Sequence, residues 1–212
     1  MTDAPLTLGL TETQLRALAA HGVARTFRQN SVVINEGDET DSLYIILSGK
    51  VKVYLADESG KEIVLNTEGP GSYFGEMVLD GGPRSASVMT LEKSTFSVVG
   101  KSEFRKFLSE NPEVAIHIIE NLIARTRALT ENVRSLALLD VYGRVAKLLL
   151  ELAREVDGKL VIADKLTQQD IANRVGASRE MISRILKDLA TGGYIKIADK
   201  KIVINKKPPA RW

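Results

Sequence analysis

The stretch LTQQDIANRVGASREMISRILKDLATGGYI, residues 166–195, has the pattern of two short helices joined by a tight turn. Thr167 and Ser178 each precede a helical run, and a hydroxyl there can accept a hydrogen bond from a backbone N–H of the first turn. Gly176 lies between the runs and tolerates the positive φ that a tight turn requires. The pattern predicts a helix-turn-helix. The residues expected to face inward are Ile171, Ala172, Val175, Ile182, Ile185, Leu186 and Leu189.

The opposite face of the second helix carries side chains that can read DNA. In a helix-turn-helix, the N-terminal end of the second helix reaches base edges in the major groove. Arginine can bond guanine through two hydrogen bonds, and glutamate can accept one from the amino group of cytosine. Hydroxyl and amide side chains can bind phosphates and so fix the register of the protein on the DNA. The expected DNA-binding residues are Thr167, Gln169, Ser178, Arg179, Glu180, Ser183, Arg184 and Lys187.

Two further features favour binding of double-stranded DNA. The simpler alternative is that the second helix is charged only because it faces solvent. Residues 195–204, IKIADKKIVI, predict a hairpin wing after the second helix. Residues 1–138 carry 14 Lys and Arg against 18 Asp and Glu, a net charge of −4, whereas residues 139–212 carry 15 against 9, a net charge of +6. A basic C-terminal part suits binding to a polyanion. Together with the helix caps, the turn glycine and the wing, this charge favours DNA binding.

The composition excludes several classes of function. The 212 residues include no cysteine and only two histidines, His21 and His117. Disulfides, thiolate catalysis and cysteine-bound metal clusters are therefore excluded, and the chain fits a reducing compartment. No apolar run reaches the roughly 18 residues of a membrane span, and residues 1–10 lack a secretory signal pattern. We expect a cytoplasmic protein that has no metal or prosthetic group, does not contact a membrane and is not an enzyme.

The N-terminal part has the pattern of an antiparallel β-roll. Thr11 and Gln14 have the spacing of a capping box and predict a helix to about Ala20. From Phe27 to Val99, short strand-like runs are separated by glycines and turns, which is typical of a roll or barrel. The expected strands span residues 32–34, 43–47, 50–55, 62–65, 86–91 and 95–99.

The pattern becomes helical after Gly100, and residues 111–138 predict one long helix with Pro112 in its first turn. Apolar residues on this helix recur at steps of three and four, which is a heptad pattern. A stripe this narrow suits a contact between two copies of the chain, although the helix could instead pack on its own roll. The residues of this stripe, called the seam below, are Ile119, Leu122, Thr126, Leu129, Val133 and Leu136.

These patterns predict an α+β chain in three parts. Residues 1–110 form the β-roll, residues 111–138 form the dimerisation helix, and residues 139–212 form a winged helix-turn-helix domain. Asp140 is expected to cap the first helix of that domain.

Residues 71–88, GSYFGEMVLDGGPRSASV, place an acid and a base in a glycine-rich loop. Gly75 to Val78 can form one helical turn whose N–H groups face an anion. Arg84 can hold phosphate oxygens through a charged fork. Glu76 can accept from a ribose hydroxyl and also orient Arg84. These groups suit the ribose and phosphate of a cyclic nucleotide, whereas the simpler alternative is a surface ion pair in a β-turn.

Two segments resemble the Crp/Fnr family of bacterial transcription regulators, and its catabolite activator branch in particular. Residues 178–187, SREMISRILK, contain the R-E-x-x-x-R triplet with which that branch reads TGTGA half-sites, as Arg179, Glu180 and Arg184. The resemblance also includes the preceding segment SLALLDVYGRVAKLLLELA, residues 135–153. Residues 74–86 resemble the phosphate-binding cassette F-G-E-(x)n-R-[SAT]-A of cyclic-nucleotide domains. The resemblance covers nearly the whole chain. It implies a cyclic-nucleotide-binding jelly-roll, a homodimer through residues 111–138, and RNA polymerase as a further partner.

The resemblance also implies the effector and the residues that bind it. By alignment of residues 125–133, Leu129 and Thr130 occupy the positions of a threonine–serine pair that binds the adenine amino group. Leucine here replaces the threonine, so recognition of the base would depend on Thr130. The expected effector is cAMP, by the habit of the family, or cGMP. The implied ligand residues are Phe74, Gly75, Glu76, Met77, Arg84, Ser85, Ala86, Arg125, Leu129 and Thr130.

Other interpretations stay open from the sequence. A haem or iron–sulfur gas sensor is one alternative, but the chain has no cysteine and only two histidines that could bind such a group. A cyclic di-nucleotide effector is found in relatives that lost the Glu–Arg pairing, and both residues are present here. A cyclic-nucleotide module that controls an enzyme would not need the R-E-x-x-x-R helix, and a regulator could act without any effector. The connector 153–165 is shorter than the polymerase-contacting loop of the catabolite activator branch, so no polymerase contact is carried over.

Overall fold

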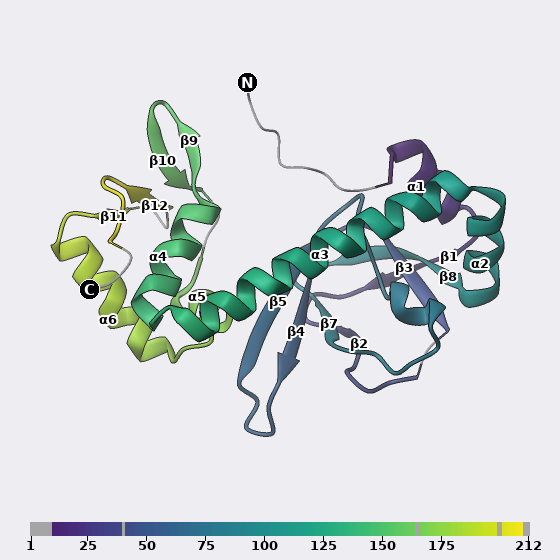
Figure 1. The fold of residues 1–212 in the computed structure, drawn as a ribbon, viewed down its shortest axis with the longest axis horizontal. Helices are drawn as coiled ribbons and strands as arrows, with labels where there is room; N and C mark the ends of the chain where they lie inside the picture. Colours follow the sequence, from purple (N-terminus) through teal and green to yellow (C-terminus); the bar gives the residue numbers. More distant parts are fainter. Residues whose placement is uncertain (1–9, 40, 164–165, 199–200, 210–212) are drawn as a thin grey trace. The chain divides into compact units, whose positions relative to one another are not determined.

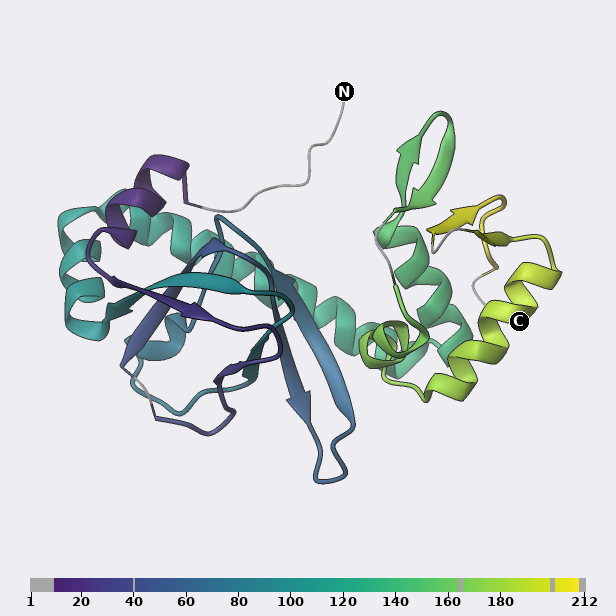
Figure 2. The ribbon, with the colours of Figure 1, turned by 180° about the vertical axis from the view of Figure 1, so that it is seen from behind.

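The computed structural model describes residues 10–39, 41–163, 166–198 and 201–209 (Figures 1 and 2). The fold is α+β, and the chain divides into two compact units. One unit comprises residues 1–55 and 64–129, and the other comprises residues 56–63 and 130–212. Within the described ranges, no helix combines the length and the apolar character that a membrane crossing requires.

The first unit is built on an antiparallel roll, as the sequence predicted. One sheet has the strand order β1-β8-β3-β6, and the other has the order β2-β7-β4-β5. The central strand β3 pairs antiparallel with both β8 and β6. The strands are β1 (Val23–Phe27), β2 (Val32–Ile34), β3 (Ser42–Ser48), β4 (Val51–Ala56), β5 (Glu62–Glu68), β6 (Tyr73–Phe74), β7 (Ser87–Thr90) and β8 (Ser94–Gly100).

The alternation of side chains gives the first sheet two buried faces. Leu43 of β3 and Tyr73 of β6 lie in an apolar cluster with the helices of this unit, whereas Ile46 and Phe74 lie in a second cluster with residues of the other sheet. Successive residues of a strand point to opposite faces, so the neighbours Tyr73 and Phe74 serve different clusters. The helices of the first cluster are α1 (Glu12–Ala19), α2 (Lys101–Glu110) and the start of α3 (Pro112–Leu138).

Two strands of the roll differ from the sequence-based prediction, whereas the break between α2 and α3 agrees with it. Strand β1 begins at Val23 rather than near Phe27, and four of its five residues are exposed. It lies at the edge of its sheet and buries no alternating face, so it left no pattern in the sequence. Strand β6 is only two residues long and lies inside the glycine-rich loop. Helix α2 is separate from α3, and it ends where Asn111 leaves the helical conformation before Pro112.

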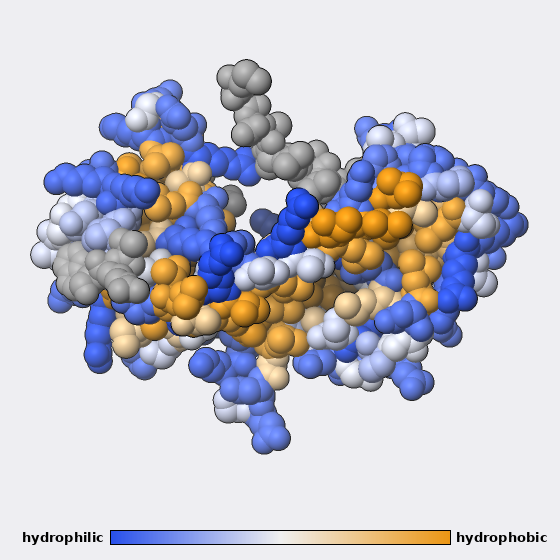
Figure 3. Space-filling model, in the orientation of Figure 1, coloured by the Kyte–Doolittle hydropathy of each residue, from blue (hydrophilic) through white to orange (hydrophobic). Residues whose placement is uncertain are grey.

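Helix α3 has a buried side and an exposed side. Near its start, Val114, Ile118 and Asn121 are buried. The six seam residues are all exposed, and Val133 is 65% exposed. Figure 3 shows hydrophobic residues gathered along this helix. The first turns of α3 therefore pack on the roll, whereas the seam is not covered by other residues of the single chain.

The second unit has the predicted helix-turn-helix. Thr167 caps α5 with a capping box, Ser178 caps α6, and Gly176 between them has a φ of 67°. Asp140 caps α4, as predicted. All seven residues expected to face inward are buried in one cluster with α4 and the small sheet. The helices are α4 (Val141–Leu152), α5 (Gln168–Val175) and α6 (Arg179–Thr191).

The small sheet of this unit has the order β11-β12-β10-β9, with antiparallel pairings. The wing predicted over residues 195–204 is the pair β11 and β12, and its turn at 199–200 lies outside the described residues. Strand β9 is an addition to the prediction, because the connector 153–165 contains a hairpin that turns at Asp157 and Gly158. The strands are β9 (Arg154–Val156), β10 (Lys159–Ile162), β11 (Ile195–Ala198) and β12 (Lys201–Ile204).

Candidate functional site

The cassette, residues 74–86, is placed by the roll and by the left-handed glycine at its start, Gly75. Phe74 is buried, with its ring stacked 5.0 Å from that of Tyr44. The chain then turns at Gly75, which has a φ of 83°, into the short 3-10 helix η1 (Glu76–Leu79). A Cβ atom on Gly75 would lie 2.9 Å from Nη1 of Arg84 and 3.1 Å from the carbonyl oxygen of Ser42. Glycine is required here both by the φ angle and by the close approach of Arg84.

Arg84 is a buried cation held by backbone rather than by a carboxylate. Its side chain crosses the cassette, and the residue is 5% exposed. Its Nη1 donates to the carbonyl of Gly75 at 2.7 Å, and its Nη2 donates to the carbonyl of Ser42 at 2.6 Å. Its Nε is buried and has no hydrogen-bond partner in the described part of the chain. Burial lowers the pKa of this guanidinium from its ordinary value, because removal from water penalises the charged form.

The expectation that Glu76 orients Arg84 is wrong, because Glu76 pairs with a different arginine. Oε1 of Glu76 accepts from Nη1 of Arg125 at 2.8 Å. Nη2 of Arg125 donates to Oε1 of Glu68 at 3.2 Å and to the carbonyl of Tyr73 at 3.1 Å. Burial alone would lower the pKa of Arg125, but the charges of Glu76 and Glu68 outweigh burial and raise it. Arg84 is oriented instead by the two carbonyls.

The remaining predicted ligand residues lie close in sequence to Arg84 or to Arg125. The Ser85 hydroxyl donates to the sulfur of Met77 at 3.1 Å, and both residues are exposed. Ala86 is half-buried at the end of the cassette. Leu129 and Thr130 are exposed one turn beyond Arg125 on α3.

Three residues of the arginine network are not among those predicted from the sequence. Glu68 ends β5, Tyr73 places its ring 5.4 Å from the Arg125 guanidinium, and the Asn121 amide donates to the Tyr73 hydroxyl at 3.0 Å. Burial raises the pKa of the Tyr73 hydroxyl. No local motif could have identified these three residues, because they come from β5, β6 and α3 and meet only in the folded unit.

The predicted DNA-binding residues form an uncovered surface. All eight are exposed, whereas the opposite side of α6 is buried in the core of the unit. Arg179 and Glu180 are the first two residues of α6, and the Ser178 hydroxyl accepts from the backbone N–H of Met181 at 3.2 Å. Arg184 lies one to two turns further along the same helix. The side chains that match the triplet therefore project from the end of the helix that reaches bases in this motif.

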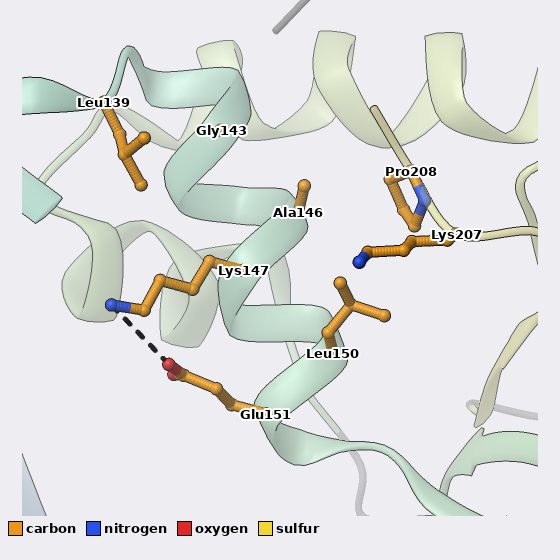
Figure 4. Close-up of a pocket in the computed structure, with 8 residues that line it drawn as sticks. All are labelled: Leu139, Gly143, Ala146, Lys147, Leu150, Glu151, Lys207 and Pro208. Atoms are coloured by element: carbon orange, nitrogen blue, oxygen red, sulfur yellow. Dashed lines mark ion pairs between the residues drawn. The ribbon is translucent and has the colours of Figure 1, made fainter. Parts of the chain in front are cut away.

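An apolar hollow of about 370 Å³ lies on α4 of the second unit (Figure 4). Leu139, Ala146 and Leu150 form much of its wall. Among its lining residues, Lys147 and Glu151 form an ion pair at 3.8 Å, and the Lys147 ammonium also donates to the Ser135 hydroxyl at 2.7 Å. None of the cassette residues lines it. The hollow is therefore not part of the cassette.

His117 does not have the environment of a haem ligand. It lies on α3, and its Nδ1 is 3.2 Å from Oε2 of Glu120 on the same helix. Its side chain is 42% exposed. This arrangement is that of a surface residue paired with a helix neighbour.

Two protein families match the chain in the places where these sites lie. Residues 24–111 match the cyclic nucleotide-binding domain, and residues 143–208 match the Crp-like helix-turn-helix domain. The first range contains the whole cassette. The second contains α5, α6 and the wing.

Characterised proteins of similar sequence are named as transcription regulators. The CRP-like cAMP-activated global transcriptional regulator of Mycobacterium tuberculosis is 36% identical over 184 residues, which is 84% of this chain and 82% of that protein. The cAMP-activated global transcriptional regulator CRP of Salmonella typhimurium is 33% identical over 199 residues, which is 92% of this chain and 95% of that protein.

A solved structure shares the fold over nearly its full length. The c-di-GMP responsive global regulator CLP of Xanthomonas campestris superposes with a TM-score of 0.78 at 25% identity, covering 91% of this chain and 98% of that protein. With the cassette, the exposed helix α6 and the two family matches, these similarities establish that the chain belongs to the Crp/Fnr family of transcription regulators and is a cyclic-nucleotide-binding, DNA-binding regulator rather than an enzyme.

Proposed function

We propose that the protein is a homodimeric regulator whose binding to a two-fold, TGTGA-like DNA site is controlled by a cyclic mononucleotide, with cAMP as the first candidate. In this proposal residues 1–110 sense the effector, residues 111–138 join the two copies, and residues 139–212 bind DNA. The observation that carries the effector assignment is the buried guanidinium of Arg84, which has hydrogen-bond capacity left and no carboxylate paired with it in the described ranges.

The chemistry of the cassette favours a ligand with a single negative charge. A guanidinium has five N–H donors, and the two backbone carbonyls occupy two of those of Arg84. The remaining N–H donors on Nη1 and Nη2 can hold the oxygens of a phosphodiester. Glu76 keeps free acceptor positions on its carboxylate for the ribose 2′-hydroxyl while Oε1 accepts from Arg125. The phosphate and the ribose of one cyclic nucleotide would therefore be bound by neighbouring residues of the same loop.

We propose that the effector acts by shifting a conformational population. Glu76 and Arg84 belong to the roll, whereas Arg125, Leu129 and Thr130 belong to α3. A ligand that contacts both favours the arrangement of α3 in which both sets of contacts are made. The two copies of α6 would then reach successive major grooves, about 34 Å apart. DNA should strengthen ligand binding by the same factor by which ligand strengthens DNA binding.

Calorimetry with a panel of nucleotides tests the effector assignment. We expect cAMP to bind with one site per chain, and 5′-AMP, which is not a diester, to bind much more weakly. Leu129 cannot form a hydrogen bond with a base, and the Thr130 hydroxyl can donate or accept, so discrimination between cAMP and cGMP should be weak.

Two outcomes of that panel would reject the assignment. One is no binding of either cyclic mononucleotide at millimolar concentration, and the other is binding of cyclic di-GMP alone. An absorption spectrum of the purified protein examines the haem and iron–sulfur alternatives separately, because either group would give a visible band.

The proposed dimer predicts the effect of a charge in the seam. Val133→Lys should convert the dimer to monomer, because it removes apolar contact in both copies and places two ammonium groups near each other. Val133 is 65% exposed in the single chain, so the substitution should not disturb the fold. Loss of two buried valines corresponds to roughly 3 kcal/mol or more, which is at least a hundredfold in the dimer dissociation constant. Sedimentation equilibrium measures this constant.

Val23→Lys is the matched control for the seam substitution. Val23 is 67% exposed on the edge strand β1, outside the seam, and undergoes the same chemical change. The control should remain dimeric. A Val133→Lys protein that associates as tightly as this control would exclude the seam as the dimer contact.

A further inference from the structure

One arginine of the first unit is shared by two carboxylates. Arg125 lies on α3, Glu76 begins η1, and Glu68 ends β5. The two bonds use different nitrogens of the guanidinium, Nη1 for Glu76 and Nη2 for Glu68. The planar fork of an arginine suits such an arrangement, because its donors point in fixed directions. The helix is therefore bonded to the roll at two separate places through one side chain.

The Glu68 side chain is held in this position by burial and by hydrogen bonds. Its side chain is only 13% exposed, similar to the 11% of Glu76. The Asn66 amide donates to the same oxygen of Glu68 at 2.8 Å. The carbonyl of Tyr73 accepts a further bond from Nη2 of Arg125 at 3.1 Å, next to the bond to Glu68. A half-buried carboxylate that lost Arg125 would be left with its charge uncompensated, which is costly.

The charges explain why a second carboxylate is useful. Without ligand, the charge of Arg125 is met by both Glu68 and Glu76. In the proposed function Glu76 also accepts from the ribose hydroxyl, so its carboxylate is shared between the ligand and Arg125, and its bond to Arg125 is weakened without being broken. With Glu76 as the sole partner, ligand binding would then loosen the contact between α3 and the roll. The proposed set of ligand residues does not include Glu68, so its bond to Arg125 can persist when the ligand binds.

We infer that Glu68 is a positioning residue that keeps α3 bonded to the roll, through Arg125, whether or not Glu76 is engaged by the effector. The inference rests on the proposed function only for the part played by Glu76. It predicts that Glu68 governs how strongly effector binding is transmitted to DNA binding, and that it contributes little to effector affinity itself.

Hydrogen exchange of the protein without nucleotide tests the bond between the helix and the roll directly. Glu68→Ala should accelerate exchange of the α3 amides around Arg125 by about tenfold, since a charge-assisted bond is lost from this segment. Glu68→Gln, which keeps the shape and one acceptor, should give a smaller increase. Glu58→Gln removes an equal charge from the exposed turn before β5 and should leave the exchange unchanged. Equal exchange in Glu68→Ala and wild type would overturn the inference.

A second measurement separates action through Arg125 from a general loss of structure. If Glu68 acts through Arg125, then Glu68→Ala should have no further effect on α3 exchange in an Arg125→Ala background. An additive effect in the double variant would show that Glu68 acts by another route, and it would also overturn the inference. Exchange in β3 and β8 should be the same in all variants if the roll is intact.

Titration with cAMP and DNA tests the consequence for signalling. Glu68→Ala should bind cAMP within about threefold of wild type, whereas the factor by which cAMP strengthens DNA binding should fall by about tenfold. Glu76→Ala should instead lose cAMP affinity. A Glu68→Ala protein with wild-type coupling would contradict the role proposed for Glu68. If wild type binds no cyclic nucleotide, the proposed function fails, and the exchange measurements still decide whether Glu68 ties α3 to the roll.

Discussion

Arg84→Leu is expected to abolish cyclic-nucleotide binding. Removal of one partner of a buried charged pair costs about 2–5 kcal/mol, which is a loss of at least about thirtyfold in affinity. The loss should fall at the upper end, because Arg84 is the cation inside the cassette and Arg125 is already paired with Glu68 and Glu76. Isothermal titration calorimetry with the nucleotide that wild type binds measures the effect.

The substitution also removes the donors for two backbone carbonyls. Gly75 and Ser42 would each have a carbonyl without its present partner, at a cost of roughly 1–3 kcal/mol for each buried group. The cassette could therefore loosen even without ligand. Arg84→Lys is a useful second variant, because it keeps the charge and lacks the fork. We expect it to recover only part of the affinity.

Arg105→Leu is the matched control for Arg84→Leu. Arg105 also donates to a backbone carbonyl, that of Leu79 at 2.7 Å, but it is exposed on α2. The control loses the same charge and the same type of bond, but at Leu79, the last residue of η1, rather than at Gly75, so its nucleotide affinity should stay close to that of wild type. If both variants bind with wild-type affinity while circular dichroism shows them folded, the cassette is not the nucleotide site.

Local signals in the sequence were sufficient to predict the helix-turn-helix of the second unit. The caps at Thr167 and Ser178 and the glycine turn at 176 depend on residues within a few positions of one another, and all three are confirmed. The inward-facing residues of α5 and α6 followed from helical periodicity, which also depends only on near neighbours. By contrast, β9 has three exposed residues and no buried face, so its sequence gave no alternation to recognise.

The ligand site was predictable only in part, for a physical reason. Gly75, Glu76 and Arg84 lie within ten positions of the chain and form a recognisable motif. Their partners do not, since the Ser42 carbonyl is 42 residues from Arg84 and Glu68 is 57 residues from Arg125. Pairing of this kind is decided by the packing of α3 on the roll. The motif alone suggested a bond between Glu76 and Arg84, and the folded unit satisfies both residues with other partners.

On the DNA side, Arg184→Ala and Glu180→Ala are expected to damage base discrimination, and Lys187→Ala is expected to weaken binding to all sequences alike. The three side chains are exposed on α6, opposite the buried face of that helix, so none of the substitutions should unfold the domain. Selection from a random DNA library should first return a two-fold site with TGTGA-like arms. Binding of each variant to this site and to its single-base variants is then measured by fluorescence anisotropy over a range of salt concentrations.

The expected pattern follows from what each side chain can bond. An arginine that bonds guanine through two hydrogen bonds contributes about 1–3 kcal/mol of discrimination, and both copies in the dimer lose it, so Arg184→Ala should cost about 2–6 kcal/mol on the full site. Glu180→Ala should relax the preference at one base pair in each arm, since only the bond to a cytosine amino group is lost. Lys187→Ala should reduce the salt dependence by about one counterion per copy without changing the preferred sequence. If instead Arg184→Ala lowered affinity equally for every base variant and reduced the salt slope as Lys187→Ala does, Arg184 would be a phosphate contact and the triplet would not read bases.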